Sequence, residues 1–437
     1  MTDTTARSGG LDRTLGLWQV TASGVGIIVG AGIYVLVGDA VALAGARTWI
    51  GFVLAALLSV LTGLSYAELT SMYPKAGAEF EYARHAFPAW IAFVVGWVMI
   101  AGLVVAAAAV SLGFGRYLGH FVDLSPTVGG LLLLAVVSAV AWSGIRHSAR
   151  ITMALSFVQV GGLVYVIVIG IPHVGQVDLL DGSTGTGGLL AAAALVFFAF
   201  IGFDEVITLA EETKDPTRTV PRALLLALGI STVLYVGVAI AAVSVIGPRA
   251  VAASPRPLAD VIDHALGGRG ADVLAVLALI ATTNTTLLCL TAASRLQYGM
   301  AGARALPAAF ARLDTRSRAP VVAIGVSVVA AAGFIMIGDL TLIASVTDLA
   351  VYLVFIAVNL AVVILRFRAP EHPRPFRTPL AVGRFPVLPV AGLVAVVVMI
   401  PALRWEALAL GAGLCLLGVG GYAWFGRRMS PQGSARP

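Results

Sequence analysis

Apolar stretches of about 20 residues recur along this chain, and each is long enough to cross a hydrocarbon core roughly 30 Å thick as a helix. Hydrophobic residues make up 59% of the 437 residues and charged residues only 11%, with a mean hydropathy of +0.97. This composition excludes a soluble globular protein and predicts an all-α integral membrane protein. We count twelve spans, at about 15–37, 49–70, 89–113, 126–144, 151–171, 188–210, 223–246, 272–294, 320–338, 341–365, 386–403 and 406–425.

The distribution of Lys and Arg residues orients these spans, because short cytoplasmic loops retain positive charge. If both termini are cytoplasmic, 22 of the 28 Lys and Arg residues fall on that side of the membrane. The net charge of +6 is then explained by loops that face anionic lipid, without a nucleic-acid partner. We expect a multi-pass protein of the cell (inner) membrane, with residues 1–14 as a cytoplasmic segment and 426–437 as a cytoplasmic tail.

Few residues could carry enzyme chemistry. The six histidines fall in predicted loops or at helix ends, without the spacing of a metalloprotease site. Cys289 and Cys415 lie inside predicted spans and form no metal or disulfide framework. Met1–Gly10 lacks the apolar core of a secretory signal. We therefore expect no enzyme activity, no catalytic residue, no metal and no cofactor.

The first span carries four glycines between Gly24 and Gly32, which predicts that its helix breaks. A break inside lipid frees backbone groups that cost several kcal/mol each unless protein, a watery cavity or a ligand accommodates them. The sixth span has a second such point at Gly202, which two acidic residues follow. Interrupted helices at matching positions of two repeats point to the substrate site of a transporter.

A purely structural interpretation of the same residues stays open. Gly26 and Gly30 have the GxxxG spacing of a helix packing face. Asp204 and Glu205 could begin the cytoplasmic end of the sixth span and remain ionised there. Against this, carboxyl groups within a membrane usually face a cavity or a partner and mark functional sites.

Several blocks of sequence occur in order along most of the chain: Gly26-Ile-Ile-Val-Gly-Ala-Gly-Ile-Tyr, the segments Tyr66–Phe80, Phe197–Val206, Ala210–Arg222 and Ala293–Met300, Leu306-Pro, and Arg374-Pro-Phe-Arg-Thr-Pro. In these blocks the chain resembles the amino acid, polyamine and organocation (APC) superfamily, in particular bacterial amino acid permeases related to the cationic amino acid transporters. The resemblance implies one transporter domain, 15–425, with a leucine-transporter-like fold. It would comprise two inverted five-helix repeats, about 15–171 and 188–365, and two extra helices, about 386–425.

The resemblance also implies where a substrate binds. Backbone amides freed in the first span would meet a substrate carboxylate, and the N-terminus of a half-helix offers such groups on physical grounds. Carbonyl groups freed in the sixth span would accept from the substrate ammonium, and Phe198, or else Phe200, matches the family's aromatic gate. The implied binding residues are Ile28, Val29, Gly30, Ala31, Gly32, Phe198, Ala199, Phe200, Ile201 and Gly202.

Coupling is where the chain departs from the family. Some proton-coupled relatives have a lysine in the fifth span where our alignment places Gln159, which cannot titrate. Gln159 could hydrogen-bond the exposed carbonyls of the first span, as would suit an exchanger or facilitator. Asp204, with Glu205 beside it, is the alternative proton carrier, since a carboxyl among apolar walls holds its proton more readily.

Oxygen-bearing side chains of the eighth span could instead serve a sodium ion; they are Thr282, Thr283, Asn284, Thr285 and Thr286. Threonine hydroxyls in membrane helices more often bond to their own backbone, which disfavours this alternative. The family motif further suggests cytoplasmic latches; the residues are Glu68, Glu211 and Glu212 with Arg218 and Arg222. Asp348 lies deep in the tenth span, and the sequence names no partner for it.

We therefore predict a permease that works by alternating access and moves an amino acid by proton-coupled symport or exchange. The alternative is a permease or exchanger for a polyamine or another organic cation, in which Asp204 or Glu205 would contact the substrate directly. A sodium-coupled symporter is a third possibility. The expected partners are a small-molecule substrate and membrane lipid, and the expected assembly is a monomer or weak homodimer.

Overall fold

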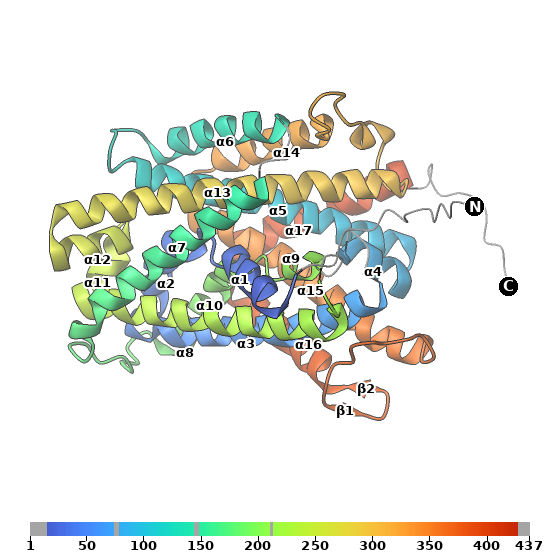
Figure 1. Ribbon diagram of the computed structural model, residues 1–437, viewed down its shortest axis with the longest axis horizontal. Helices are drawn as coiled ribbons and strands as arrows, with labels where there is room; N and C mark the ends of the chain where they lie inside the picture. Colours follow the sequence, from blue (N-terminus) through green and yellow to red (C-terminus); the bar gives the residue numbers. More distant parts are fainter. Residues whose placement is uncertain (1–14, 74–77, 144–147, 210–212, 427–437) are drawn as a thin grey trace, which may run out of the picture.

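The computed structural model describes residues 15–73, 78–143, 148–209 and 213–426. Helices dominate this part of the chain, and many of the long ones run along the long axis of the molecule (Figure 1). Within it, seven helical segments are long and apolar enough to cross a membrane, and shorter apolar helices lie among them. The chain is thus a multi-pass, all-α membrane protein.

The first half of the described chain contains α1 (Leu17–Ile28), α2 (Gly32–Ala44), α3 (Thr48–Met72), α4 (Ala78–Ala86), α5 (Ala89–Leu118), α6 (Pro126–Trp142), α7 (Ser148–Gly170), α8 (Gly185–Val196), the 3₁₀ helix η3 (Phe197–Phe200) and α9 (Glu205–Thr208). The second half contains α10 (Pro216–Ile246), α11 (Pro248–Ala253), α12 (Pro257–Leu266), α13 (Gly268–Gly302), α14 (Val321–Ile335), α15 (Leu340–Arg368), the strands β1 (Ala381–Val382) and β2 (Phe385–Pro386), α16 (Val387–Met399) and α17 (Trp405–Gly421). Short 3₁₀ turns at Gly45–Arg47, Ile171–His173, Ala308–Ala311 and Ile400–Ala402, and a π-helical end at Tyr422–Gly426, complete the list.

Helices occupy each of the twelve predicted ranges, which confirms the helical class. Local sequence explains several of their first residues. Ser125 accepts a hydrogen bond from the amide of Val128 before α6, and Asp339 accepts one from Leu342 before α15. Pro216 begins α10 at the one helical position where proline costs nothing. That all twelve ranges cross the bilayer, and that they form two inverted repeats, stays a prediction.

The central helix is α5, along which α13, α15, α6 and α14 pack (Figure 1). Most of α5 is buried, and small residues let neighbouring helices approach it closely. A Cβ at Gly113 would lie only 2.4 Å from Cγ2 of Val35, so that α2 can approach α5 at this level only beside a glycine. The broken helices are thus held against a rigid, closely packed core.

Large apolar side chains are exposed on the helices at the periphery, as expected where lipid replaces water. Val329 of α14 is 73% exposed, Leu416 of α17 is 71% exposed and Val136 of α6 is 60% exposed. In a soluble protein such residues would be a liability, but in a bilayer they mark lipid-facing surface.

Candidate functional site

The first predicted break lies between α1 and α2, at residues 29–31. All three amides in the break itself have partners. The amide of Val29 donates to Val25 (2.7 Å), that of Gly30 to Ile28 (2.7 Å), and that of Ala31 to the Thr285 hydroxyl of α13 (3.0 Å). The amides without an acceptor in the described chain are the first three of α2, from Gly32 to Tyr34. Of the amides at 28–32 that were expected to be free, only that of Gly32 lacks an acceptor in the described chain, and substrate binding there stays a prediction.

The second predicted break follows α8, where the chain tightens into η3 and then leaves helical geometry until α9. Gly202 has a φ of +108°, a conformation that favours glycine, so the interruption falls at the residue that the sequence indicated. The carbonyl of Phe198 accepts from the amide of Ile201 at 3.3 Å. Of the carbonyl groups predicted to be free, this one is thus already engaged.

The two breaks touch each other. A Cβ at Gly32 would lie 2.6 Å from the Cα of Ala199, so only glycine allows this approach of backbone to backbone. The hydroxyl of Tyr235, on α10, lies 2.7 Å from the carbonyl oxygen of Ile28 and 2.8 Å from that of Ala199. Its single proton can serve either carbonyl, so Tyr235 links the end of α1 to η3.

Sequence reasoning missed Tyr235. The available signal was its phenol group in an otherwise aliphatic stretch of α10, since a buried tyrosine hydroxyl needs a partner. Its ring also packs edge-on against Phe200, with centroids 5.1 Å apart, and Phe200 is fully buried. Phe198 keeps 6% of its surface exposed and Ile201 is half-buried. Of the two predicted gate residues, Phe200 is therefore packed into the core.

The fifth predicted span meets the first break through a residue other than Gln159, and the eighth meets it through only one of its predicted oxygen-bearing side chains, Thr285. Gln159 is fully buried, but neither side-chain atom has a hydrogen-bond partner in the described chain, so it does not bond the carbonyls of α1. The hydroxyl of Ser156, one turn earlier on α7, donates to the carbonyl of Gly26 instead (3.0 Å). Thr282 and Thr283 donate to carbonyls of their own helix, as predicted for threonine in a membrane, whereas Thr285 faces the break.

Carboxyl groups gather beside the second break. One oxygen of Asp204 accepts from the amide of Gly202 (3.2 Å), and its side chain is buried. Glu79, on α4, is also buried and lies near it; burial, helped by the charge of Asp204, raises the pKa of Glu79 to about 8. Glu205 begins α9 and lies within electrostatic reach of Arg295. Glu79 was not predicted, although it stands in the Tyr66–Phe80 block.

Comparison with known proteins decides the family. Residues 15–410 match the amino acid permease family. This matched range includes both breaks and the carboxyl groups beside them. The chain belongs to the amino acid permease family. The resemblance to the APC superfamily drawn from the sequence blocks is thereby confirmed, and the permease is a transporter rather than an enzyme.

Relatives of this permease transport different solutes. It is 28% identical to the branched-chain amino acid permease of Bacillus subtilis, over 96% of this chain and 94% of the relative. It is also 28% identical to the methylthioribose transporter of the same organism, over 88% and 87% of the two chains. It is 31% identical to the vacuolar cationic amino acid transporter 4 of Arabidopsis thaliana, over 83% of this chain and 64% of the relative.

One predicted latch exists in the permease, but with different partners. Glu68, near the end of α3, is buried and accepts from Arg366 of α15 at 3.0 and 2.6 Å. It also accepts from the amide of Thr378 (2.8 Å) and pairs with Arg374 (3.5 Å). The expected pairing with Arg218 and Arg222 is wrong for Glu68, because the loop after α15 folds back over α3. Glu211 and Glu212 lie outside the described residues.

Asp348 of α15 is fully buried, and neither carboxyl oxygen has a hydrogen-bond partner in the described parts of the permease. Tyr352, one turn further along α15, donates to the carbonyl of Ala194 in α8 (3.2 Å). Its ring lies 4.8 Å from that of Phe197 at the start of η3. Asp348 thus lies one helical turn from the residue that supports the second break.

Proposed function

We propose that this permease is a secondary active transporter that moves an amino acid by alternating access between the two broken helices. The observation that carries the proposal is the contact between the breaks, where Gly32 meets Ala199 and the Tyr235 hydroxyl reaches a carbonyl of each. Broken helices in the first span of each of two predicted repeats, meeting each other, are the usual place for a transporter's substrate.

The backbone at this contact suits the two ends of a zwitterion. The unpaired amides of Gly32 to Tyr34 form the N-terminus of α2, which favours a substrate carboxylate. The carbonyl of Ile28 already accepts from the amide of Gly30, and the Tyr235 hydroxyl can donate either to it or to the carbonyl of Ala199. When the hydroxyl donates to Ile28, the Ala199 carbonyl is left for a substrate ammonium.

The side chains near the breaks favour a neutral substrate with an apolar side chain. Phe198, Ala199 and Phe200 are apolar, and Asp204 turns one oxygen to the amide of Gly202. A cationic side chain would need a carboxylate aimed at it, because an unpaired charge is costly in this setting. The similarity to the branched-chain amino acid permease agrees with this choice.

Proton coupling is assigned to the buried pair of Asp204 and Glu79. Two carboxyl groups close together cannot both ionise without strong repulsion, so the pair retains a proton. Asp204 adjoins Gly202, and a change in its proton occupancy would act directly on the second break. We infer that one proton binds this pair during each transport cycle.

Uptake into proteoliposomes tests the proposal. Leucine, arginine and spermidine are offered with an inward proton gradient, with a sodium gradient and with neither. We expect leucine uptake driven by the proton gradient, and loss of that stimulation in Asp204→Asn but not in Asp123→Asn, an exposed loop residue.

Two results would overturn parts of the proposal. Uptake of spermidine without uptake of any amino acid would replace it with the organic-cation permease. Leucine uptake that responds only to sodium, or that keeps its proton stimulation in Asp204→Asn, would refute coupling through the carboxyl pair while leaving amino acid transport in place.

A further inference from the structure

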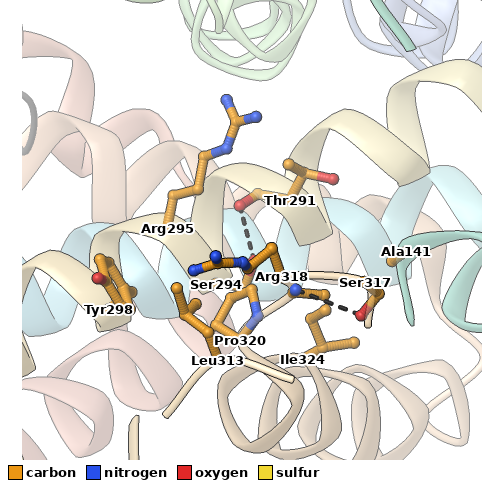
Figure 2. A pocket seen from close by; sticks show the side chains of 11 residues that line it. Ala141, Thr291, Ser294, Arg295, Tyr298, Leu313, Ser317, Arg318, Pro320 and Ile324 are labelled. Atoms are coloured by element: carbon orange, nitrogen blue, oxygen red, sulfur yellow. Dashed lines mark hydrogen bonds between the residues drawn. The ribbon is translucent and has the colours of Figure 1, made fainter. Parts of the chain in front are cut away.

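A cavity of about 350 Å³ lies between α13, α14 and the end of α6, outside the contact of the two breaks. Figure 2 shows the side chains that line it, which come from α13, from the loop that leads into α14, and from α14 itself. Thr291, Ser294 and Arg318 contribute its polar surface, whereas Ala141 and Ile324 contribute apolar walls. The cavity therefore offers polar groups on one side and hydrocarbon on the other.

The polar groups of this cavity are incompletely satisfied. Thr291 is only 9% exposed, and its hydroxyl has no hydrogen-bond partner in the described chain. The Arg318 guanidinium makes no ion pair and no hydrogen bond with any residue that the structure describes, while Arg295 points away from it (Figure 2). Ser294 is already engaged, since its hydroxyl donates to the carbonyl of Thr291 (2.9 Å). Arg318 is exposed and Thr291 is buried, and both line the same cavity, so that an unpartnered hydroxyl and an unpaired guanidinium together form a donor set for an anion.

The loop that carries Arg318 has an excess of positive charge. Between α13 and α14 it holds Arg304, Arg312, Arg316 and Arg318 against a single acid, Asp314. The carboxylate of Asp314 accepts from the amides of Arg316 (3.0 Å) and Ser317 (2.8 Å), and these hydrogen bonds hold its pKa below the usual value. Asp314 is thus occupied within the loop and leaves the Arg318 charge uncompensated.

The surroundings of the cavity are those of a lipid site. Next to it, α6 and α14 pack together and present exposed apolar side chains, such as Val140 (47%) and Val326 (49%). With both termini in the cytoplasm, the loop lies at the inner leaflet, where anionic lipids gather. Basic pockets between membrane helices on this side are suited to phosphate-bearing headgroups.

We propose that this cavity binds a phosphate group, carried by an anionic phospholipid of the inner leaflet or by a soluble phosphate. The Arg318 guanidinium pairs with the phosphate oxygens, the Thr291 hydroxyl donates to one of them, and the walls at Ala141 and Ile324 contact hydrocarbon. The proposal is independent of which amino acid the permease transports.

Native mass spectrometry of the delipidated full-length protein in detergent tests this site. The protein is titrated with phosphatidylglycerol and, separately, with phosphatidylcholine. A third arm measures the melting temperature of the protein with inorganic phosphate. Arg318→Gln removes the charge, Thr291→Val removes the hydroxyl at constant shape, and Thr291→Ser restores the hydroxyl. Arg316→Gln is the matched control, since Arg316 lies on the same loop but does not line the cavity.

We expect the unsubstituted protein to bind phosphatidylglycerol more tightly than phosphatidylcholine. Compared with the unsubstituted protein, Arg318→Gln should bind phosphatidylglycerol about tenfold more weakly and Thr291→Val several-fold more weakly. Thr291→Ser and Arg316→Gln should bind like the unsubstituted protein. Stabilisation by inorganic phosphate that Arg318→Gln abolishes would assign the site to a soluble phosphate. Equal binding of both lipids to all variants, without any phosphate effect, would overturn the proposal. Elution of each variant as a single monodisperse species excludes misfolding.

Discussion

Tyr235 shows how one hydroxyl can serve two helices. The two carbonyl oxygens within its reach, of Ile28 and Ala199, belong to segments about 170 residues apart, and neither can find a helical donor because each helix is interrupted there. The Ile28 carbonyl also accepts from the amide of Gly30 (2.7 Å), so the hydroxyl matters most for Ala199, since a buried carbonyl without a donor costs about 1–3 kcal/mol. The hydroxyl therefore compensates for the interruption of the two helices at the proposed substrate site.

Tyr235→Phe should weaken amino acid binding about tenfold while the protein still inserts and folds. The substitution keeps the ring packed against Phe200 but leaves Ile28 and Ala199 without a shared donor, so the two breaks lose their common anchor. Melting-temperature shifts over a concentration series of substrate give the affinity.

Tyr165→Phe is the control for this measurement, because the Tyr165 hydroxyl faces Gly270 at the start of α13. Equal affinities for the two variants and the unsubstituted protein would show that the hydroxyl of Tyr235 has no part in the site.

At the scale of elements, the latch around Glu68 ties α3, α15 and the loop before β1 together. A buried carboxylate is tolerable there because Arg366 meets both of its oxygens and Arg374 and the Thr378 amide complete the set. Arg374 also donates to the carbonyls of Leu365 and Ala369 at the end of α15. The loop is thus fixed by charge rather than by an apolar core.

Arg366→Met should destabilise the protein by about 3–5 kcal/mol, because it leaves the charge of Glu68 buried with an incomplete set of partners. Thermal unfolding in detergent, followed by loss of monodisperse protein, measures the change. The control is Arg404→Met, which breaks exposed pairs with Asp339 and Glu406 and should change the melting temperature far less. A comparable loss in both variants would mean that burial of the latch contributes nothing.

At the scale of the whole molecule, the buried Glu79 links folding to pH. Its pKa is about 8 in the folded protein against an ordinary value of 4.5, so the folded state binds a proton that the unfolded state releases. Stability from this group is therefore present below about pH 4.5 and is lost as the pH rises toward 8.

Melting temperatures recorded across this pH range should fall with rising pH for the unsubstituted protein. Glu79→Gln should flatten that dependence, since an amide mimics the protonated carboxyl and does not titrate. Glu371→Gln, an exposed residue, serves as the control. A Glu79→Gln curve parallel to the unsubstituted one would show that Glu79 titrates normally.

The sequence could predict the helical membrane class and the positions of both breaks, because these follow from local properties such as apolar length and the φ freedom of Gly202. It could not predict which hydroxyl faces a break. Thr282 and Thr285 lie on one short stretch of α13, and only the packing of that helix decides that Thr285 meets Ala31. The partner of Glu68 was beyond local reasoning too, since Arg366 lies 298 residues away.

The contact of Gly32 with Ala199 has a mechanical consequence. Because a single methyl group would not fit between them, the two interrupted helices are in direct backbone contact at this point. We therefore predict that, in the proposed alternating-access cycle, the two breaks move together rather than independently. A displacement of either span would act on the other through this backbone contact, through the Tyr235 hydroxyl, and through the packing of α2 against α8 and η3.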